Sequence, residues 1–546
     1  MNGPVPPIWT TGSTEVFKTG SWRAALPQHI RAPSPCHAAC PVNGDIAEWI
    51  GLARSRDFRA AWEVLTRHNP FPAIAGRICH HPCETACNRA GFDEAISICR
   101  LERFVGDLAL EQGWMFAPPA QERSERIAVV GGGPSGLSAA FQLRRRGYRV
   151  TLLEAQPALG GLMRYGIPPY RLARPVLDGE IARIVALGIK VRCNEALAGA
   201  GALQRLRDEH DAVYLATGAR RQKRLHQLDY AQPWVMDGAE YLARSSVGET
   251  PALGRRLVVI GGGSAAFDVA RSARRAGHEV TIVALENTRQ LPAQREEIDE
   301  ALEEGIVLVT RSMLTTTTAT AGGVRLELVR VKFEAGPTRG RFSVTPVPDS
   351  EFALMADAIV PSIGQDPDLF DLGALAADGN LLRVDARQAT SDERIYAGGD
   401  LVSQARFVTE AVGMGKRAAS QIDRCLRDAS DEAEWGEAVV PLTAIATACY
   451  PKQTRAAAAR LAPPQRLASD AEVQLGLDVE AALAESGRCF SCGTCVLCDN
   501  CVVVCPDLAV RREGSGYVVL GDFCKGCGLC VKECPTGSMK MLEEAR

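Results

Sequence analysis

Two stretches of the chain repeat one pattern of apolar and polar positions. Residues 127–130 form an apolar run that leads into close-set glycines, and a helical stretch and a second apolar run follow, up to Glu154. The pattern returns at Leu257 and ends at Glu286. A buried strand, a helix and a second buried strand in this order are typical of a doubly wound α/β fold. The chain is therefore predicted to hold two such units.

The glycines of the first turn have the spacing of a dinucleotide-binding site. Gly131 makes the tight bend, Gly133 lets the backbone approach a pyrophosphate, and Gly136 lets the helix pack close to the sheet. The helix N-terminus, which is the positive end of its dipole, points at the phosphates. Glu154 lies 18 residues after Gly136, where a carboxylate accepts hydrogen bonds from a ribose.

The second turn differs at its last glycine position. Gly261 and Gly263 repeat the first two positions, and Ala266 takes the third, where alanine is tolerated. Its second strand ends at Glu286, so an acidic side chain again closes the unit.

The rest of the central region predicts that the second unit is inserted into the first. Gly- and Pro-rich residues 160–172 predict a loop, and residues 212–219 predict a buried strand that ends in Thr217 and Gly218. Residues 306–354 alternate polar and apolar positions, which favours an antiparallel segment. Short strands over 356–364 and 394–400 then return the chain to the first unit.

Composition narrows the class of protein. A length of 546 residues predicts about three or four domains, and 46% hydrophobic residues is ordinary for a globular chain. The net charge of −3 argues against electrostatically driven nucleic-acid binding. We find no long uncharged apolar run and no basic, apolar leader, so the expectation is a cytoplasmic protein that does not insert into a membrane.

The 19 cysteines are clustered rather than spread. Six lie between Cys36 and Cys99 and ten between Cys489 and Cys534. Clustered thiols in a large cytosolic chain indicate metal or iron–sulfur ligands rather than a disulfide framework. The other three are expected to be small buried side chains: Cys193, Cys425 and Cys449.

The C-terminal cysteines form two runs with ferredoxin spacing. Each run has two-residue gaps, then a three-residue gap, and closes in Cys-Pro; in this arrangement the fourth cysteine ligates the other cluster. One predicted set is Cys495, Cys498, Cys501 and Cys534, and the other is Cys505, Cys524, Cys527 and Cys530. Cys489 and Cys492 extend the first run backwards, and the spacing leaves open whether they shift its register, bind another metal or bind none.

The N-terminal cysteines flank a predicted helical hairpin. Residues 45–68 have apolar positions at helical spacing, so thiols on both sides of this stretch can meet. The candidate ligands are Cys36, Cys40, Cys79, Cys83, Cys87 and Cys99. A [4Fe–4S] cluster takes four thiolates, so one cluster is provided for and a second needs other ligands. Zinc is the alternative, although these spacings are not the paired form of a zinc site.

Several motifs carry a family resemblance. Residues 30–430 resemble the small (β) subunit of glutamate synthase and its relatives, through CHAACP, NPFPAIAGRICHHPCETAC, GGGPSGL, GGLMRYGIPPYRL, ATGA, GGGSAAFDVA and AGGD. The last 60 residues resemble a bacterial two-cluster ferredoxin, which that subunit does not carry. The expected domains are an N-terminal iron–sulfur unit (1–120), an FAD unit in two parts (121–250 and 355–430), an NAD(H) unit (251–354), a connector (431–485) and a ferredoxin unit (486–546).

The resemblance implies FAD at the first turn and a nicotinamide dinucleotide at the second, on the nested fold of thioredoxin reductase-like flavoproteins. It places Asp400 near the FAD ribityl or pyrophosphate, residues 160–168 along the isoalloxazine, and the helix that begins near Thr409 at the flavin edge. The full expected set is Gly131, Gly133, Pro134, Ser135, Gly136, Glu154, Gly161, Leu162, Arg164, Gly166, Ile167, Thr217, Gly218, Gly261, Gly263, Ser264, Ala265, Ala266, Asp268, Glu286, Gly364, Gly399, Asp400, Thr409, Glu410 and Ala411.

The chain also departs from the family pattern. NADPH-using members carry an arginine pair where this chain has Leu285 and Glu286. A carboxylate binds a free 2′-hydroxyl and repels a 2′-phosphate, so we predict a preference for NADH. Ala75 replaces a frequent cysteine, Cys99 is added, and Glu102 matches a position where two relatives place a non-cysteine ligand.

These parts predict an FAD-dependent NAD(P)H:ferredoxin-type oxidoreductase subunit. It would pass electrons between NAD(H) and ferredoxin or a catalytic iron–sulfur partner, such as a 2-oxoacid:ferredoxin oxidoreductase, in a hetero-oligomer. Hydride transfer to flavin requires no side-chain base, so no catalytic residue is assigned. The main alternative is a glutamate synthase small subunit that serves a separate amidotransferase. A disulfide reductase would need a redox CxxC facing the flavin, and residues 257–350 contain no cysteine. The last alternative is an electron-carrying adaptor without nicotinamide turnover.

Overall fold

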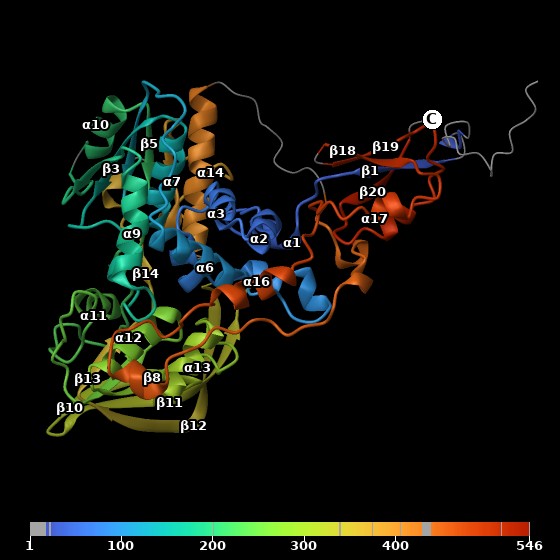
Figure 1. Ribbon diagram of the computed structural model, residues 1–546. Coiled ribbons are helices and arrows are strands. Elements are labelled where there is room, and N and C mark those ends of the chain that lie inside the picture. Colours follow the sequence, from blue (N-terminus) through green and yellow to red (C-terminus); the bar gives the residue numbers. More distant parts are fainter. Residues whose placement is uncertain are drawn as a thin grey trace, which may run out of the picture.

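The computed structural model describes residues 18–20, 23–199, 201–337, 340–373, 375–404, 406–427, 438–514 and 516–544. Residues 1–17 of the predicted N-terminal unit, residues 428–437 at the junction of the FAD unit and the connector, and residues 545–546 of the ferredoxin unit lie outside the described residues. Figure 1 shows the two glycine-turn units one above the other, with the blue N-terminal helices beside them and the red C-terminal unit further out.

The first glycine-turn unit is built on a parallel sheet in the order β17-β5-β2-β3-β4. Its strands are β2 (Arg126–Val130), β3 (Arg149–Glu154), β4 (Lys190–Cys193), β5 (Ala212–Leu215) and β17 (Ile395–Ala397). Its helices are α7 (Pro134–Arg145), α8 (Leu162–Tyr165), α9 (Arg174–Val185), α10 (Ala202–Glu209) and α14 (Val408–Leu426). The apolar runs of β2 and β5 are buried, as parallel strands covered on both faces must be.

The second unit is inserted between β5 and β17, as the sequence predicts. Its parallel sheet has the order β13-β7-β8-β9 and is flanked by an antiparallel sheet in the order β10-β11-β12. The strands are β7 (Arg256–Ile260), β8 (Glu279–Val283), β9 (Val307–Val309), β10 (Ser312–Thr320), β11 (Gly323–Ala335), β12 (Phe342–Ala356) and β13 (Ala358–Pro361). The helices are α11 (Gly238–Ser245), α12 (Ser264–Arg275) and α13 (Arg295–Glu303).

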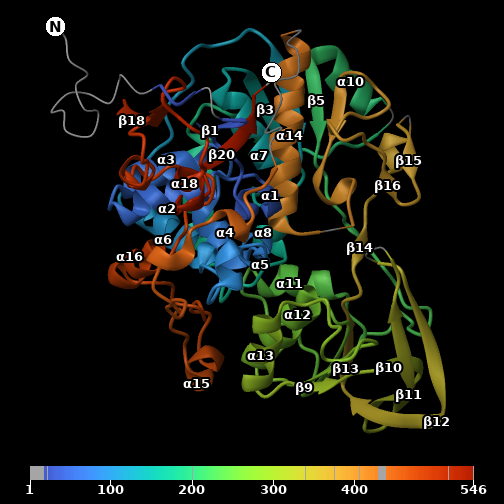
Figure 2. The same ribbon diagram turned by 90° about the vertical axis from the view of Figure 1, so that its right-hand side faces the viewer.

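Two chain crossings join the two units. The outgoing strand β6 (Arg221–Gln222) pairs antiparallel with the returning strand β14 (Gln365–Asp366). This short ladder lies between the upper and lower units in Figure 2. The units are therefore linked by a narrow double crossing, and other contacts must fix their relative orientation.

The N-terminal unit is helical. Its helices are α1 (Pro35–Ala39), α2 (Ile46–Arg54), α3 (Phe58–Thr66), α4 (Pro72–Ile78), α5 (Pro82–Thr85) and α6 (Ile98–Glu111). The backbones of α4 and α6 touch, because a Cβ on Gly76 would lie 2.3 Å from Arg103 N and one on Gly106 would lie 2.2 Å from Ala73 N. Glycine at both positions brings the end of α4 close to the start of α6, where the candidate ligands lie.

The C-terminal unit closes a sheet with the start of the described chain. Strand β1 (Ala25–His29) pairs antiparallel with β20 (Met539–Glu543), from Ala25 opposite Glu543 to His29 opposite Met539. The remaining elements are α16 (Val479–Gly487), α17 (Asn500–Val503), β18 (Val510–Glu513), β19 (Gly516–Val519) and α18 (Leu529–Lys532). Figure 1 shows β1, in blue, lying among the red strands.

Before it reaches that unit, the connector passes along the second glycine-turn unit. Helix α15 (Pro463–Leu467) lies next to α13 in Figure 2. Within the part of the chain that the structure describes, no helix is long and apolar enough to cross a membrane.

The prediction for the three scattered cysteines is wrong at two positions. Cys193 is half-buried, but Cys425 and Cys449 are exposed. A lone cysteine carries no pattern that marks it as a core residue, so its burial depends on tertiary contacts that the sequence does not show.

Candidate functional site

A cavity of about 1720 Å³ extends along the carboxyl ends of both parallel sheets. A pocket for one small ligand reaches about 1,000 Å³ at most, so this cavity has room for two dinucleotides. Its lining includes these predicted residues: Gly131, Gly133, Pro134, Ser135, Glu154, Gly161, Leu162, Gly166, Ile167, Thr217, Gly218, Gly261, Gly263, Ser264, Ala265, Asp268, Glu286, Gly364, Gly399, Asp400 and Ala411.

The first glycine turn is packed tightly beneath the cavity. A Cβ on Gly136 would lie 1.9 Å from the carbonyl oxygen of Gly131, and Gly131 itself has a φ of 109°. Gly132 N donates to Glu154 Oε2 at 2.7 Å, and Gln156 N donates to Oε1 at 2.7 Å. Backbone donors thus fix the carboxylate at the edge of the turn, where it can accept hydrogen bonds from the hydroxyls of a ribose. The residues present fit the adenosine end of FAD.

The second glycine turn accommodates a methyl group at its third position. Ala266 is fully buried there, where the first turn needs glycine. A Cβ on Gly262 would lie 2.7 Å from Glu286 Oε2, which places the carboxylate directly against this turn. Burial raises the pKa of Glu286. The turn and its carboxylate fit the adenosine end of a nicotinamide dinucleotide.

The first unit also builds the far end of its site from distant segments. Asp400, just after β17, lines the cavity, and burial raises its pKa to about 6 although Arg406 lowers it. Helix α14 begins beside it, and Ser138 Oγ donates to Val412 O at 2.8 Å, which ties α7 to α14. The positive end of the α14 dipole therefore faces this end of the cavity.

The remaining predicted cofactor residues do not line the cavity. Gly136 and Ala266 pack beneath their turns, and Arg164 pairs with Asp178 outside the site. Thr409 and Glu410 lie in the first turn of α14. Thr409 is buried and its hydroxyl lies 3.6 Å from Cys79 Sγ, so this residue connects the cavity end to the N-terminal thiols.

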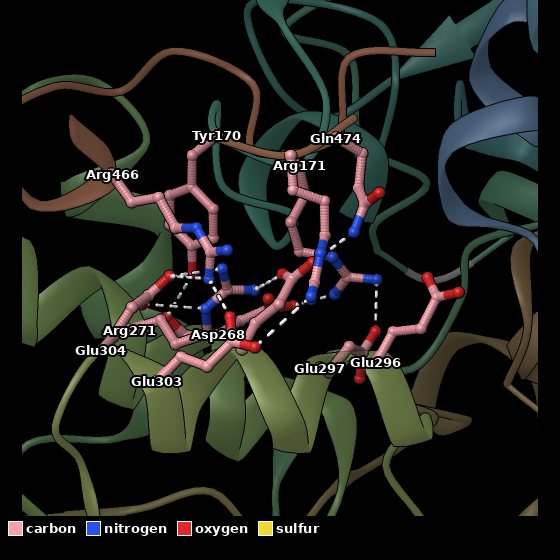
Figure 3. A network of polar contacts seen from close by, with 12 residues as sticks. Tyr170, Arg171, Asp268, Arg271, Glu296, Glu297, Glu303, Glu304, Arg466 and Gln474 are labelled. Carbon is pink, nitrogen blue, oxygen red and sulfur yellow. Dashed lines mark hydrogen bonds and ion pairs between the residues drawn. The ribbon is translucent and has the colours of Figure 1, made fainter. Parts of the chain in front are cut away.

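A buried polar network holds the second unit against the first (Figure 3). Arg171, from the loop after α8, contacts Asp268 at 2.7 Å and Glu297 at 2.5 Å. Tyr170 OH donates to Asp268 O at 3.2 Å. Burial raises the pKa of Asp268, and the charge of Arg171 opposes that change. The ion pair thus stabilises the charged carboxylate at the wall of the cavity.

The connector takes part in the same network (Figure 3). Arg466 of α15 donates to Glu303 at 2.8 Å, and Gln474 donates to Glu300. Arg271 contacts Glu304 at 2.7 Å within the second unit. The sequence pattern assigns this connector no role, because its contacts are with residues more than 150 positions away.

One group of N-terminal thiols lies close to the cavity end. Burial raises the pKa of Cys83, and the neighbouring Cys40, Cys79 and Glu102 raise it further. Asn69 Nδ2 donates to Glu102 Oε1 at 2.7 Å, and burial raises the pKa of Glu102 to about 7. The structure thus brings together three thiols and one carboxylate, supplied by the ends of α1, α4 and α5 and by α6.

Two other N-terminal thiols face away from this group. Cys36 and Cys87 line a small second cavity together with Cys489 and Cys492. Cys99 is buried, with its thiol 3.5 Å from Ala75 O. The spacing of the N-terminal cysteines gave no means of dividing them in this way.

The C-terminal thiols of the two runs lie near one another. Burial raises the pKa of Cys501, and its thiol neighbours Cys498, Cys495, Cys534 and Cys530 raise it further. Burial likewise raises the pKa of Cys530, which has Cys524, Cys505 and Cys527 as neighbours. Cys534 thus lies near the first run and Cys505 near the second, and the division into two ligand sets stays a prediction.

Among the described residues, no group of three or more His, Cys, Asp or Glu is placed to hold a single metal ion. A zinc site needs its thiolates about 2.3 Å from one centre. Four thiolates are the ligands that a [4Fe–4S] cluster takes, and the residues present supply that donor set.

Three family models match three separate parts of the chain. The family model for pyridine nucleotide-disulphide oxidoreductases matches residues 125–415. A model for dihydropyrimidine dehydrogenase domain II with a 4Fe-4S cluster matches residues 31–114, and a 4Fe-4S dicluster model matches residues 494–539.

Curated relatives match across these regions. The chain is 34% identical to the NADP(+)-dependent formate dehydrogenase subunit beta of Moorella thermoacetica over 84% of this chain and 70% of that protein. It is 31% identical to the NAD-dependent dihydropyrimidine dehydrogenase subunit PreT of Escherichia coli, over 72% and 92%. It is 29% identical to the small chain of NADPH glutamate synthase from Azospirillum brasilense, over 71% and 85%.

Proposed function

Because this chain belongs to the pyridine nucleotide-disulphide oxidoreductase family, we propose that it is the subunit that passes electrons between NADH and a partner iron–sulfur enzyme. The observation that carries the proposal is one continuous cavity that includes both glycine turns and ends beside a group of thiols. FAD fits the first turn, NAD(H) fits the second, and [4Fe–4S] clusters fit the thiol groups.

When bound, FAD takes up two electrons as a hydride and releases them singly to iron–sulfur centres. The protein's own part is to place and insulate these groups. The α14 N-terminus provides positive potential at the flavin end, and Asp400 lies in the lining beside it. Cys79 contacts Thr409 in the first turn of α14, so the thiol group nearest the flavin lies directly behind that helix end.

The NADH preference is supported by Glu286. Its carboxylate lies against Gly262, at the turn where the adenosine ribose is bound. The relatives include both NAD- and NADP-linked proteins, so they do not decide the preference for this chain. We expect kcat/KM to be at least about tenfold higher for NADH than for NADPH, the ratio that about 1.4 kcal/mol of differential binding produces.

Anaerobic titration tests the central proposal. NADH added to the complete protein should bleach the flavin absorbance, and reduced iron–sulfur signals should follow in the electron paramagnetic resonance spectrum. If the protein binds flavin but neither NADH nor NADPH bleaches the flavin absorbance, the proposal is wrong. The chain would then be an electron-carrying adaptor without nicotinamide turnover.

The proposal for the partner rests on the C-terminal unit. Residues 494–539 match a two-cluster ferredoxin model and form an electron exit distant from the cavity. We propose ferredoxin or a catalytic iron–sulfur subunit, such as a 2-oxoacid:ferredoxin oxidoreductase, as partner. The likeness to a glutamate synthase small chain keeps an amidotransferase partner as the second candidate. Purification of the native complex distinguishes the two candidate partners. A thiamine-dependent or other iron–sulfur oxidoreductase in the complex supports the first candidate, and a large amidotransferase supports the second.

A further inference from the structure

Four cysteines from opposite ends of the chain surround the small second cavity. Cys36 and Cys87 come from the N-terminal unit, and Cys489 and Cys492 come from the segment before the ferredoxin runs. The rest of the lining is largely apolar: Pro35, Ile46, Ala47, Ile50, Ile96, Ile98 and Phe490, with Asn88 and Arg89.

The segment that carries Cys489 and Cys492 is held on the N-terminal unit by buried polar contacts. Arg89 is 1% exposed and donates to Arg488 O at 2.7 Å, one residue before Cys489. Arg488 in turn contacts Asp93 at 3.2 Å. Asn88 Nδ2 lies 3.5 Å from Cys492 Sγ and donates to Val440 O at 3.0 Å. These contacts fix the position of the late cysteines relative to the early ones.

The four thiols are also electrostatic neighbours. The thiol of Cys36 has those of Cys489, Cys492 and Cys87 as neighbours, and Cys492 has Cys489 and Cys87. Cys36 and Cys492 are buried, and Cys87 and Cys489 are half-buried. Four thiolates so placed are costly unless a positively charged centre compensates them. A bound iron–sulfur core provides that compensation.

We propose that Cys36, Cys87, Cys489 and Cys492 together ligate a [4Fe–4S] cluster, so that the C-terminal segment completes a site of the N-terminal unit. The inference rests on the proposed function only in taking iron–sulfur chemistry as given. It assigns Cys40, Cys79, Cys83 and Glu102 to a separate site nearer the flavin, and it leaves the ferredoxin sets unchanged.

The proposed site lies where it can connect the two ends of the electron path. Gly493 N, one residue after Cys492, donates to Thr536 O at 2.7 Å. The hydroxyl of Thr536 lies 3.6 Å from the thiol of Cys534, a member of the first ferredoxin set. The cluster would therefore stand between the flavin-side thiols and the ferredoxin unit.

The test compares iron and acid-labile sulfide per chain in complete, anaerobically reconstituted protein. The variants are Cys36→Ala/Cys87→Ala, Cys489→Ala/Cys492→Ala and the quadruple combination, with Cys425→Ala as an exposed control. Each double variant should lose about four irons and four sulfides, and the quadruple variant should lose no more than either. Adding Cys501→Ala to Cys36→Ala/Cys87→Ala should instead increase the loss, because that thiol belongs to another set.

Two outcomes would overturn the proposal. Iron unchanged in Cys489→Ala/Cys492→Ala, or additive losses in the quadruple variant, would show that the early and late pairs do not share a cluster. Zinc in place of the lost iron would show a different metal.

A measurement on unaltered protein guards against variants that fail to fold. Iron-replete protein is alkylated and mapped by mass spectrometry, and labelling of Cys489 while Cys36 stays protected would contradict a shared cluster. Flavin bleaching by NADH is recorded separately, so failure of this proposal is distinguishable from failure of the proposed function.

Discussion

The two glycine turns share a sequence pattern but differ in how closely they are packed. In the first, a Cβ at Gly136 would overlap the Gly131 carbonyl at 1.9 Å, and Glu154 is only 8% exposed. In the second, the fully buried Ala266 takes the corresponding position, and Glu286 is half-buried. The first turn is also covered by α14 and by the loop at Gly161.

This difference suggests that the first site retains its ligand and that the second exchanges it. A tightly packed site covered by distant segments suits a cofactor that stays bound, and a roomier one suits a substrate that must enter and leave with each turnover. The polar network of Figure 3 holds the second unit against the first. The predictions below test this contrast, from the largest expected effect to the smallest.

Exchanging the third residue of each turn should separate the sites most clearly. Gly136→Ala places a methyl group against a backbone carbonyl that cannot move freely, and overpacking of this kind costs about 1–3 kcal/mol. We expect flavin per chain to fall by about tenfold or more. The matched change Ala266→Gly should leave flavin content unchanged, and a flavin loss in that variant alone would reverse the contrast. Absorbance after gel filtration measures both.

Breaking the network between the units should be the next largest effect. Arg171→Met leaves Asp268 and Glu297 buried without their cation, and removal of one partner of a buried pair costs about 3–5 kcal/mol. We expect a lower unfolding midpoint in thermal denaturation. Arg164→Met is the control, because its pair with the exposed Asp178 contributes about 1 kcal/mol or less. Equal effects of the two changes would show that the network does not hold the units together.

Reversing the charge at the second turn should change cofactor choice. Glu286→Arg removes the acceptor for a free 2′-hydroxyl and adds a partner for a 2′-phosphate. The ratio of kcat/KM for NADH to that for NADPH should fall by about tenfold or more. Flavin content should stay constant, since Glu154 serves the other site. A ratio that does not change would show that Glu286 does not contact the ribose.

The smallest expected effect is a pH dependence of the preference for NADH over NADPH. Burial raises the pKa of Glu286, so lowering the pH protonates this side chain sooner than an ordinary glutamate. The charged form repels a 2′-phosphate, and the preference for NADH should therefore weaken as the pH falls from about 8 to about 5.5. Glu286→Gln should remove this dependence. Steady-state ratios at several pH values provide the measurement.

The sequence predicts those features of the fold and the site whose residues lie close together along the chain. The turn at Gly131 and the run from Cys495 to Cys505 combine their chemistry within a few residues, so their spacing alone predicts a tight turn and a cluster site, and the tight turn is present in the structure. The insertion of the second unit is also recovered, since apolar strands mark where the chain leaves and returns.

Contacts between distant segments could not be predicted. Nothing in the spacing of Cys489 and Cys492 points to Cys36, more than 450 positions earlier, and their regular gap left open a shifted ferredoxin register, another metal or none. The contact of Arg466 with Glu303 is a similar case. A single charged side chain gives no indication of its partner, because either member would be equally at home on a solvated surface.

The pairing of β1 with β20 has a consequence for biosynthesis. Residues 25–29 leave the ribosome more than 500 residues before their partners at 539–543. The nascent chain must therefore carry strand β1 unpaired while the intervening units fold in turn. Closure of this sheet has to wait for those units, and a translation product truncated before residue 539 would be left with an open edge on which other chains can pair.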